Sequence, residues 1–153
     1  MRRAVIAAVI LVLIAASLLG YTVYAESQAL MALNTAIVGV KVSGADFTRM
    51  HLNLIMEFRN PTNHETPPFT AEFDVYISGV RVSNGTTKRA VVPAGANSTV
   101  EVPVTIHTVE LVSAVVEALQ AGEFELEVRG VMHSRLLFGA IPVSREFSAS
   151  FHA

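Results

Sequence analysis

The chain has 153 residues, enough for one domain and a short appendage. Hydrophobic residues make up 52% and charged residues 16%, and a terminal segment must account for this apolar excess over ordinary soluble domains. The absence of cysteine excludes disulfides, thiolate chemistry and cysteine-based zinc sites. The 11 basic residues fall to 9, against 13 acidic ones, when Arg2 and Arg3 are set aside, so the remainder has no basic footprint for nucleic acid.

Residues 1–25 have the features of a membrane anchor. No charged residue occurs from Ala4 to Ala25, and such a stretch can cross a hydrocarbon core of about 30 Å as a helix. Arg2 and Arg3 precede it, which predicts a single-pass protein of the cell membrane with a cytoplasmic N-terminus and an extracytoplasmic domain. A signal peptide, with secretion after cleavage at Ala25, stays open as an alternative. The length of the apolar core favours the retained anchor.

Residues 26–34 are predicted to form a short juxtamembrane linker. Ala29, Leu30 and Leu33 have helical spacing, so the linker can continue the preceding helix. As a helix it would span only about 14 Å, which keeps the following domain close to the membrane. Residues 35–153 are then expected to form that domain.

The most regular β signal is the segment Arg49–Arg59, in which apolar and polar residues alternate, except at Ile55. A period of two places alternate side chains on opposite faces of a sheet. Asn60-Pro61 ends the strand, because proline has no N–H for the ladder and asparagine can fold its side chain onto a turn. The inward side chains of this predicted core strand are Met50, Leu52, Leu54, Met56 and Phe58.

Shorter alternating runs predict the other strands and their connections. Gly79 and Asn84-Gly85 are typical of turns, and Ser134-Arg135 is expected to connect the last two strands. Pro103 lies inside a strand pattern, which indicates an edge strand or a bulge. The remaining predicted strands are residues 36–42, 69–78, 89–92, 99–106, 123–130 and 143–151.

One helix is predicted among these strands, with Thr108 as its N-cap and Gly122 as its stop. About seven short strands with turns every 8–12 residues are typical of an immunoglobulin- or fibronectin-type sandwich. We therefore predict an all-β fold with one short helix. It is an immunoglobulin/fibronectin III-like antiparallel β-sandwich, preceded by one N-terminal transmembrane helix.

Four motifs of this chain, taken in order and spacing, resemble the WHy (water stress and hypersensitive response) domain of the late embryogenesis abundant type 2 family. They are Phe58-Arg59-Asn60-Pro61-Thr62, Tyr76-Ile77-Ser78-Gly79, Val92-Pro93-Ala94-Gly95-Ala96-Asn97-Ser98-Thr99-Val100-Glu101-Val102-Pro103-Val104 and Leu126-Glu127-Val128-Arg129-Gly130. The similarity covers residues 35–153. It implies a compact β-sandwich with one helix, a link to desiccation and stress tolerance, and no catalytic residues. The family commonly has Asn-Pro-Asn where this chain has Asn60, Pro61 and Thr62.

Few residues outside these motifs suggest chemistry. The five histidines, at positions 51, 64, 107, 133 and 152, include no pair at helical i,i+4 spacing and are expected in loops or on the surface. Glu123, Glu125 and Glu127 share a strand face, most simply a solvated one that discourages edge pairing. We therefore predict no catalytic residue, no cofactor and no metal site.

Two kinds of surface feature are candidates for contact or modification. Asn84 and Asn97 each begin an Asn-x-Ser/Thr triplet in a predicted loop, and are candidate glycosylation sites with chance triplets as the equal alternative. Leu136, Leu137 and Phe138 form an apolar run between strands. The simpler interpretation is that it folds back onto the open end of the sandwich. The sharper one is that it contacts a partner or the nearby bilayer.

These observations lead to one expected function and one alternative. The first is a non-catalytic, membrane-anchored extracytoplasmic domain of the late embryogenesis abundant type 2 kind, involved in desiccation or stress protection. The alternative is an extracytoplasmic binding or scaffold module of a cell-surface or membrane complex. The expected partner is the membrane, through the N-terminal helix, with a protein partner left open and no nucleic acid.

Overall fold

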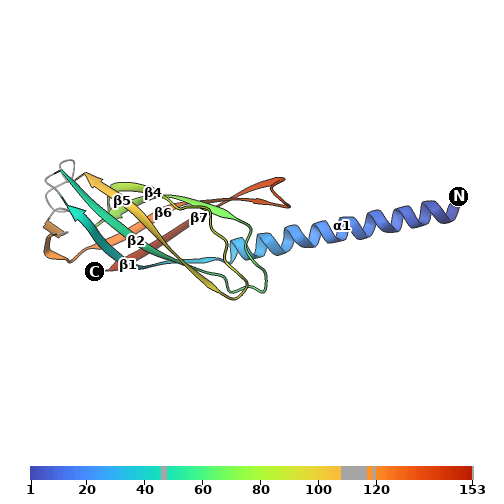
Figure 1. The fold of residues 1–153 in the computed structure, drawn as a ribbon, viewed down its shortest axis with the longest axis horizontal. Coiled ribbons are helices and arrows are strands. Elements are labelled where there is room, and N and C mark those ends of the chain that lie inside the picture. Colours follow the sequence, from blue (N-terminus) through green and yellow to red (C-terminus); the bar gives the residue numbers. More distant parts are fainter. Residues whose placement is uncertain (46–47, 108–116, 119, 153) are drawn as a thin grey trace.

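The computed structural model describes residues 1–45, 48–107, 117–118 and 120–152. A long helix, α1 (Arg2–Met31), precedes a β-sandwich and leaves it at one end, roughly along its long axis (Figure 1). The strands of the described residues are β1 (Asn34–Ala45), β2 (Arg49–Arg59), β3 (Phe69–Ile77), β4 (Val80–Thr86), β5 (Asn97–His107), β6 (Glu125–Leu136) and β7 (Ile141–His152).

The strands form two sheets, in the orders β1-β2-β5 and β4-β3-β6-β7. Every neighbouring pair is antiparallel. The fourth strand pairs with the third and stays in the sheet of the sixth and seventh, an arrangement of the immunoglobulin-like sandwiches. The predicted fold class is therefore confirmed.

The core is built from the two strands whose alternation is most regular. The inner face of β2 is buried as predicted at Leu52, Leu54, Met56 and Phe58, while Met50 is half-buried. The predicted inward face of β3 is also buried, and its side chains are Phe69, Ala71, Phe73, Val75 and Ile77. The rings of Phe58 and Phe69 meet edge to face, with centroids 5.2 Å apart, and join the two sheets.

The edge strand predicted from Pro103 is β5, which pairs with β2 alone in its sheet. The other edge of that sheet is β1, whose register shifts between Ile37 and Gly39 and again between Val42 and Gly44. A proline on one edge and irregular pairing on the other both hinder the addition of a further strand.

Two predicted turns are wrong, because each segment lies inside a strand. Asn84 and Gly85 belong to β4, where a Cβ on Gly85 would lie 2.8 Å from the Phe73 ring. This glycine therefore permits close packing rather than a turn. Ser134 and Arg135 belong to β6, and the polar Ser134 can occupy a buried position because its Oγ donates to the carbonyl oxygen of Pro68 at 2.7 Å. The connection to β7 comes later, at residues 137–140.

The short strand predicted at residues 89–92 is also wrong in extent. Ala90 makes an isolated bridge to Phe69, and its neighbours join no ladder. The helix predicted from Thr108 to Gly122 lies mostly outside the described residues. Of its span, residues 117, 118, 120 and 121 are described and are helical.

α1 continues well past the apolar segment. It ends at Met31, and Ala25, Ala29 and Leu30 are buried against the sandwich. Within the described residues it is the one helix long and apolar enough to cross a membrane, although a signal sequence near an N-terminus has the same features. No residue of its most apolar window is buried.

Candidate functional site

The end of the sandwich that receives α1 carries most of the unusual features of the molecule. We call it the helix end and define it by residues 60–68, 92–96 and 137–140, together with the last turns of α1 from Ala25 (Figure 1). These three segments connect different strand pairs, so the fold brings them together from distant parts of the sequence.

The last turns of α1 form part of the hydrophobic core. Leu30 and Leu33 are 0% and 1% exposed and belong to the same buried cluster as the inner faces of β2 and β3. Arg145 of β7 donates from Nη1 to the carbonyl oxygens of Leu30 at 2.9 Å and Leu33 at 2.6 Å. A cation at a helix C-terminus satisfies carbonyls that have no partner within the helix and opposes the negative end of its dipole. The helix is therefore fixed to the domain by packing and by charge.

The β6–β7 connection is held against α1 one turn before that buried end. The backbone N–H of Leu137 donates to Glu26 Oε2 at 2.9 Å. Leu137, Phe138 and Gly139 have φ values of 53°, 55° and 91°, in the left-handed region that favours glycine. Two bulky residues in that conformation store backbone strain, and such strain tends to occur where a segment has a function.

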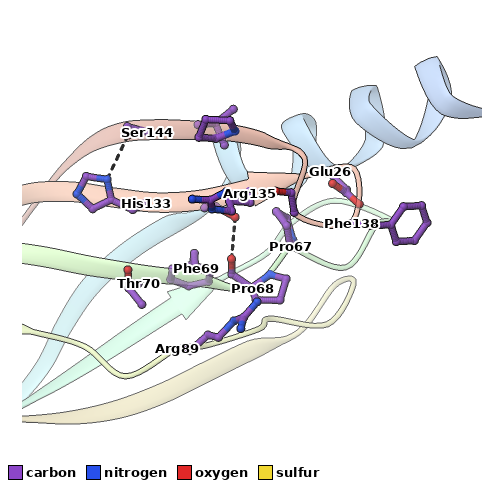
Figure 2. Close-up of a pocket in the computed structure, with 14 residues that line it drawn as sticks. Glu26, Pro67, Pro68, Phe69, Thr70, Arg89, His133, Arg135, Phe138 and Ser144 are labelled. Carbon is purple, nitrogen blue, oxygen red and sulfur yellow. Dashed lines mark hydrogen bonds between the residues drawn. The ribbon is translucent and has the colours of Figure 1, made fainter.

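The predicted apolar patch is divided by the structure. Leu136 ends β6 and is 3% exposed, so it belongs to the packed interior as the simpler interpretation predicts. Leu137 is half-buried, whereas Phe138 is 93% exposed. Figure 2 shows the Phe138 ring pointing away from the neighbouring side chains, on the side where α1 leaves the domain.

The motif turn Asn60-Pro61-Thr62 has a structural role that its sequence only partly indicates. Asn60 is 1% exposed, and its Nδ2 donates to the carbonyl oxygens of His64 at 2.6 Å and Val92 at 3.2 Å. Its Oδ1 accepts from the backbone N–H of Thr62 at 3.0 Å. One amide thus connects the loop after β2 to the segment before β5. Thr62 Oγ1 lies 2.7 Å from Asn60 Oδ1, so the hydroxyl takes part in the turn in place of the family's asparagine.

An open groove of about 880 Å³ lies beside the β6–β7 connection. Its polar lining includes Glu26 of α1, Arg89, His133 and Arg135, and Phe138 stands at its edge (Figure 2). His133 is engaged on both ring nitrogens, with Nε2 3.5 Å from Glu72 and Nδ1 3.2 Å from Ser144 Oγ. Within the described part of the chain, neither Arg89 nor Arg135 makes an ion pair.

The other candidates from the sequence do not come together into a site. Asn84 lies within β4 and Asn97 begins β5, and both are exposed. Among the described residues, no three metal-ligating side chains gather in one place.

The run of glutamates contains an ion pair. Glu127 accepts hydrogen bonds of 2.6 and 3.0 Å from Arg129, whose guanidinium also lies 4.9 Å from the centre of the Tyr76 ring. The Arg129 hydrogen bond holds the pKa of the Glu127 carboxyl below its ordinary value. The ionised carboxylate suits a solvated strand face.

Sequence reasoning did not identify Glu26 as a residue of the helix end, or Arg89, Arg135 and Arg145 as residues beside it. Arg89 and Arg135 line the groove, and Arg135 bonds only four residues along the chain, to Gly139. Glu26 and Arg145 bond to backbone groups far along the chain, as in the bonds from Leu137 to Glu26 and from Arg145 to Leu30. No local pattern encodes such a contact. The one available signal was Glu26 itself, a carboxylate placed directly after an apolar helix.

Comparisons with known proteins find a family model and several solved structures that are similar to this chain. A family model described as "Late embryogenesis abundant protein" matches residues 56–146. The solution structure of AT1g01470 from Arabidopsis thaliana is similar with a TM-score of 0.60 and 12% identity, over 78% of this chain and 79% of that one. A solution structure of a protein described as late embryogenesis abundant, At2g46140.1, has a TM-score of 0.45 and 11% identity, over 92% and 83% of the two chains. A protein from Archaeoglobus fulgidus has a TM-score of 0.44 and 12% identity, over 78% and 95%. No curated protein matches in sequence.

Proposed function

Because the chain belongs to the late embryogenesis abundant protein family, we propose that it is a membrane-anchored domain that protects the cell surface during desiccation and related stress. The role is non-catalytic, as the resemblance to the WHy domain implies. The domain acts outside the cytoplasm and is held beside the bilayer by α1.

One observation carries the anchoring part of this proposal. No residue of the apolar window of α1 is buried, while the last turns of the same helix are packed in the domain core. An apolar surface of that size has no counterpart in a water-soluble monomer, and a bilayer supplies the apolar phase that it needs. The charges of Arg2 and Arg3, placed before the apolar segment, favour retention of the N-terminus in the cytoplasm.

Topology is tested by adding protease to intact cells and by washing their membranes with carbonate. We expect the domain to be degraded from outside and full-length protein to stay in the washed membranes. Release of a soluble fragment that begins at Glu26 would instead establish cleavage of a signal peptide. Protection of the domain from protease in intact cells would contradict the proposed orientation.

Protection is tested by deleting the gene and exposing the cells to drying or osmotic shock. We expect lower survival, restored by the full-length protein. Complementation with residues 26–153 carrying a cleavable secretion signal separates the contribution of the anchor from that of the domain. Equal survival of the deletion strain and its parent would contradict the protective role and leave the anchoring to be judged by its own test.

A further inference from the structure

We propose that the helix end docks on anionic phospholipid headgroups of the same membrane, with Phe138 inserted in the interface and Arg89 and Arg135 contacting lipid phosphates. The inference rests on the proposed crossing of the bilayer by α1. It assigns a ligand to the groove beside the β6–β7 connection and a purpose to the strained, exposed residues at its edge.

The height of the connection above the bilayer follows from α1. The segment from Ala4 to Tyr24 has no charged residue and, as a helix, spans about 31 Å, close to the thickness of a hydrocarbon core. Glu26 therefore lies at the level of the headgroups. The 2.9 Å hydrogen bond from the Leu137 N–H to Glu26 fixes the β6–β7 connection at that same level.

A second loop contacts α1 further toward its N-terminus than Glu26. The ring of His64, from the loop after β2, lies edge to face against Tyr21, with the two centroids 5.8 Å apart. Tyr21 is further toward the N-terminus than Glu26, so this loop extends beside the outermost part of the apolar segment. Tyrosine is enriched at membrane interfaces, which agrees with this placement. The domain thus approaches the bilayer at two points rather than standing away from it.

Phe138 is poorly suited to water. It is 93% exposed, and both it and Leu137 adopt the left-handed backbone conformation. A turn with small polar residues would connect the strands without exposing an aromatic ring to water and without straining the backbone of a bulky residue. An aromatic side chain at headgroup depth removes apolar surface from water, and this gain explains why a phenylalanine is displayed there.

The groove supplies the charge that an anionic headgroup needs. Arg135 reaches toward the connection, with Nη1 3.3 Å from the carbonyl oxygen of Gly139. Arg89 lines the groove beside it, and the one carboxylate of the lining, Glu26, already accepts the Leu137 N–H. The planar guanidinium matches the geometry of a phosphate. Since acidic residues outnumber basic ones in the chain, attraction to an anionic surface must come from such a local site.

The test uses the full chain with Phe138→Trp, because the protein has no tryptophan of its own. The protein is reconstituted into vesicles of phosphatidylcholine alone or mixed with phosphatidylglycerol, with brominated acyl chains as quenchers. We expect blue-shifted, quenched emission in the anionic vesicles. The matched control is Val42→Trp, at an exposed position toward the opposite end of β1, which should be neither shifted nor quenched.

The headgroup contact is tested in the same Phe138→Trp background. Removing both charges with Arg89→Gln and Arg135→Gln should shift the docking equilibrium about 25-fold toward the undocked state, at about fivefold for each arginine near an anionic surface. The control is Arg81→Gln with Arg129→Gln, which removes the same charge from β4 and β6 away from the helix end. That control should leave the quenching unchanged.

Three outcomes would overturn the proposal. If the protein floats with the vesicles but the tryptophan at 138 behaves like the one at 42, α1 spans the bilayer and the helix end does not dock. Equal quenching in both lipid compositions, unaffected by the two arginine changes, would show that the docking does not depend on an anionic headgroup. A shift that depends on the number of protein molecules per vesicle would assign Phe138 to a second copy of the chain. Failure to float refutes the anchoring itself.

Discussion

The two parts of α1 form one uninterrupted helix but have opposite surroundings. Up to Tyr24 no side chain is buried, whereas Ala25, Ala29 and Leu30 are 8%, 0% and 0% exposed. Both parts are rich in apolar residues, so hydrophobicity alone does not distinguish them. The difference lies in Glu26, Ser27 and Gln28, polar residues that leave only one face of the last turns apolar. An all-round apolar helix needs an apolar phase, while a one-faced helix can pack on a protein.

The largest expected effect contrasts a leucine from each part. Leu30→Asp places an unpaired carboxylate in the core and should lower the free energy of unfolding of the domain by about 3 kcal/mol or more. Leu11→Asp lies on the uncovered part and should leave unfolding unchanged, while making membrane insertion less favourable by about 2.5–3.5 kcal/mol. Denaturant unfolding in detergent measures the effect on domain stability, and membrane flotation measures the effect on insertion. Equal effects on unfolding would contradict the division of α1.

A smaller loss is expected from Arg145→Met, which keeps the length of the side chain but removes the donor to the carbonyls of Leu30 and Leu33. The free energy of unfolding should fall by about 2 kcal/mol, since hydrogen bonds from a charged group are the stronger ones. The control is Arg81→Met, which breaks an exposed pair with Asp74 and should cost less than about 1 kcal/mol. A smaller effect at Arg145 than at Arg81 would show that packing alone holds the helix.

One turn earlier, Glu26→Ala should have a more local effect. It removes the acceptor of the Leu137 N–H and should destabilise the β6–β7 connection by about 1 kcal/mol. Hydrogen exchange should show reduced protection of the Leu137 amide and unchanged protection of β2. Glu26→Gln retains an acceptor oxygen, so its protection of the Leu137 amide should lie between that of the unchanged protein and that of the alanine variant. Unchanged exchange at Leu137 in the alanine variant would mean that the connection is held by other contacts.

The smallest effect is expected at the boundary between the two parts. Tyr21 is exposed. Its ring packs edge to face against the ring of His64. A double-mutant cycle of Tyr21→Ala and His64→Ala should give a coupling of about 0.5–1 kcal/mol. A coupling larger than the loss of about 2 kcal/mol expected for Arg145→Met would move the boundary between the two parts of α1 toward the N-terminus.

Sequence reasoning was most successful where a local period decides the structure. The alternation around Leu54 and Phe73 predicted two buried strand faces, because a period of two assigns alternate residues to opposite sides. It failed at Gly85 and Ser134, whose residue types are typical of turns. Position 85 of the strand is a glycine because the Phe73 ring lies where a Cβ would stand. Ser134 is tolerated at a buried strand position because the distant carbonyl oxygen of Pro68 accepts from its hydroxyl.

The helix end could be predicted only in part, for the same physical reason. The turn at Asn60 and the apolar run ending in Phe138 were visible in the sequence, and the spacing of Leu30 and Leu33 indicated one apolar face. The residue that caps the end of this helix could not be predicted, because Arg145, which donates to the carbonyl oxygen of Leu30, lies 115 positions further along the chain. Long-range pairs of this kind are set by topology, and a local pattern does not contain them.

The junction at Ala25 has a mechanical consequence. A spanning helix tilts when its apolar length exceeds the thickness of the bilayer. Under the proposed anchoring, such a tilt would be transmitted to the domain, because α1 continues into the core and lies roughly along the long axis of the sandwich (Figure 1). A few degrees at the membrane become a sideways displacement of the far loops that grows with their distance from the lipid. For a domain anchored as proposed, local bilayer thickness would thereby set the angle between the domain and the membrane.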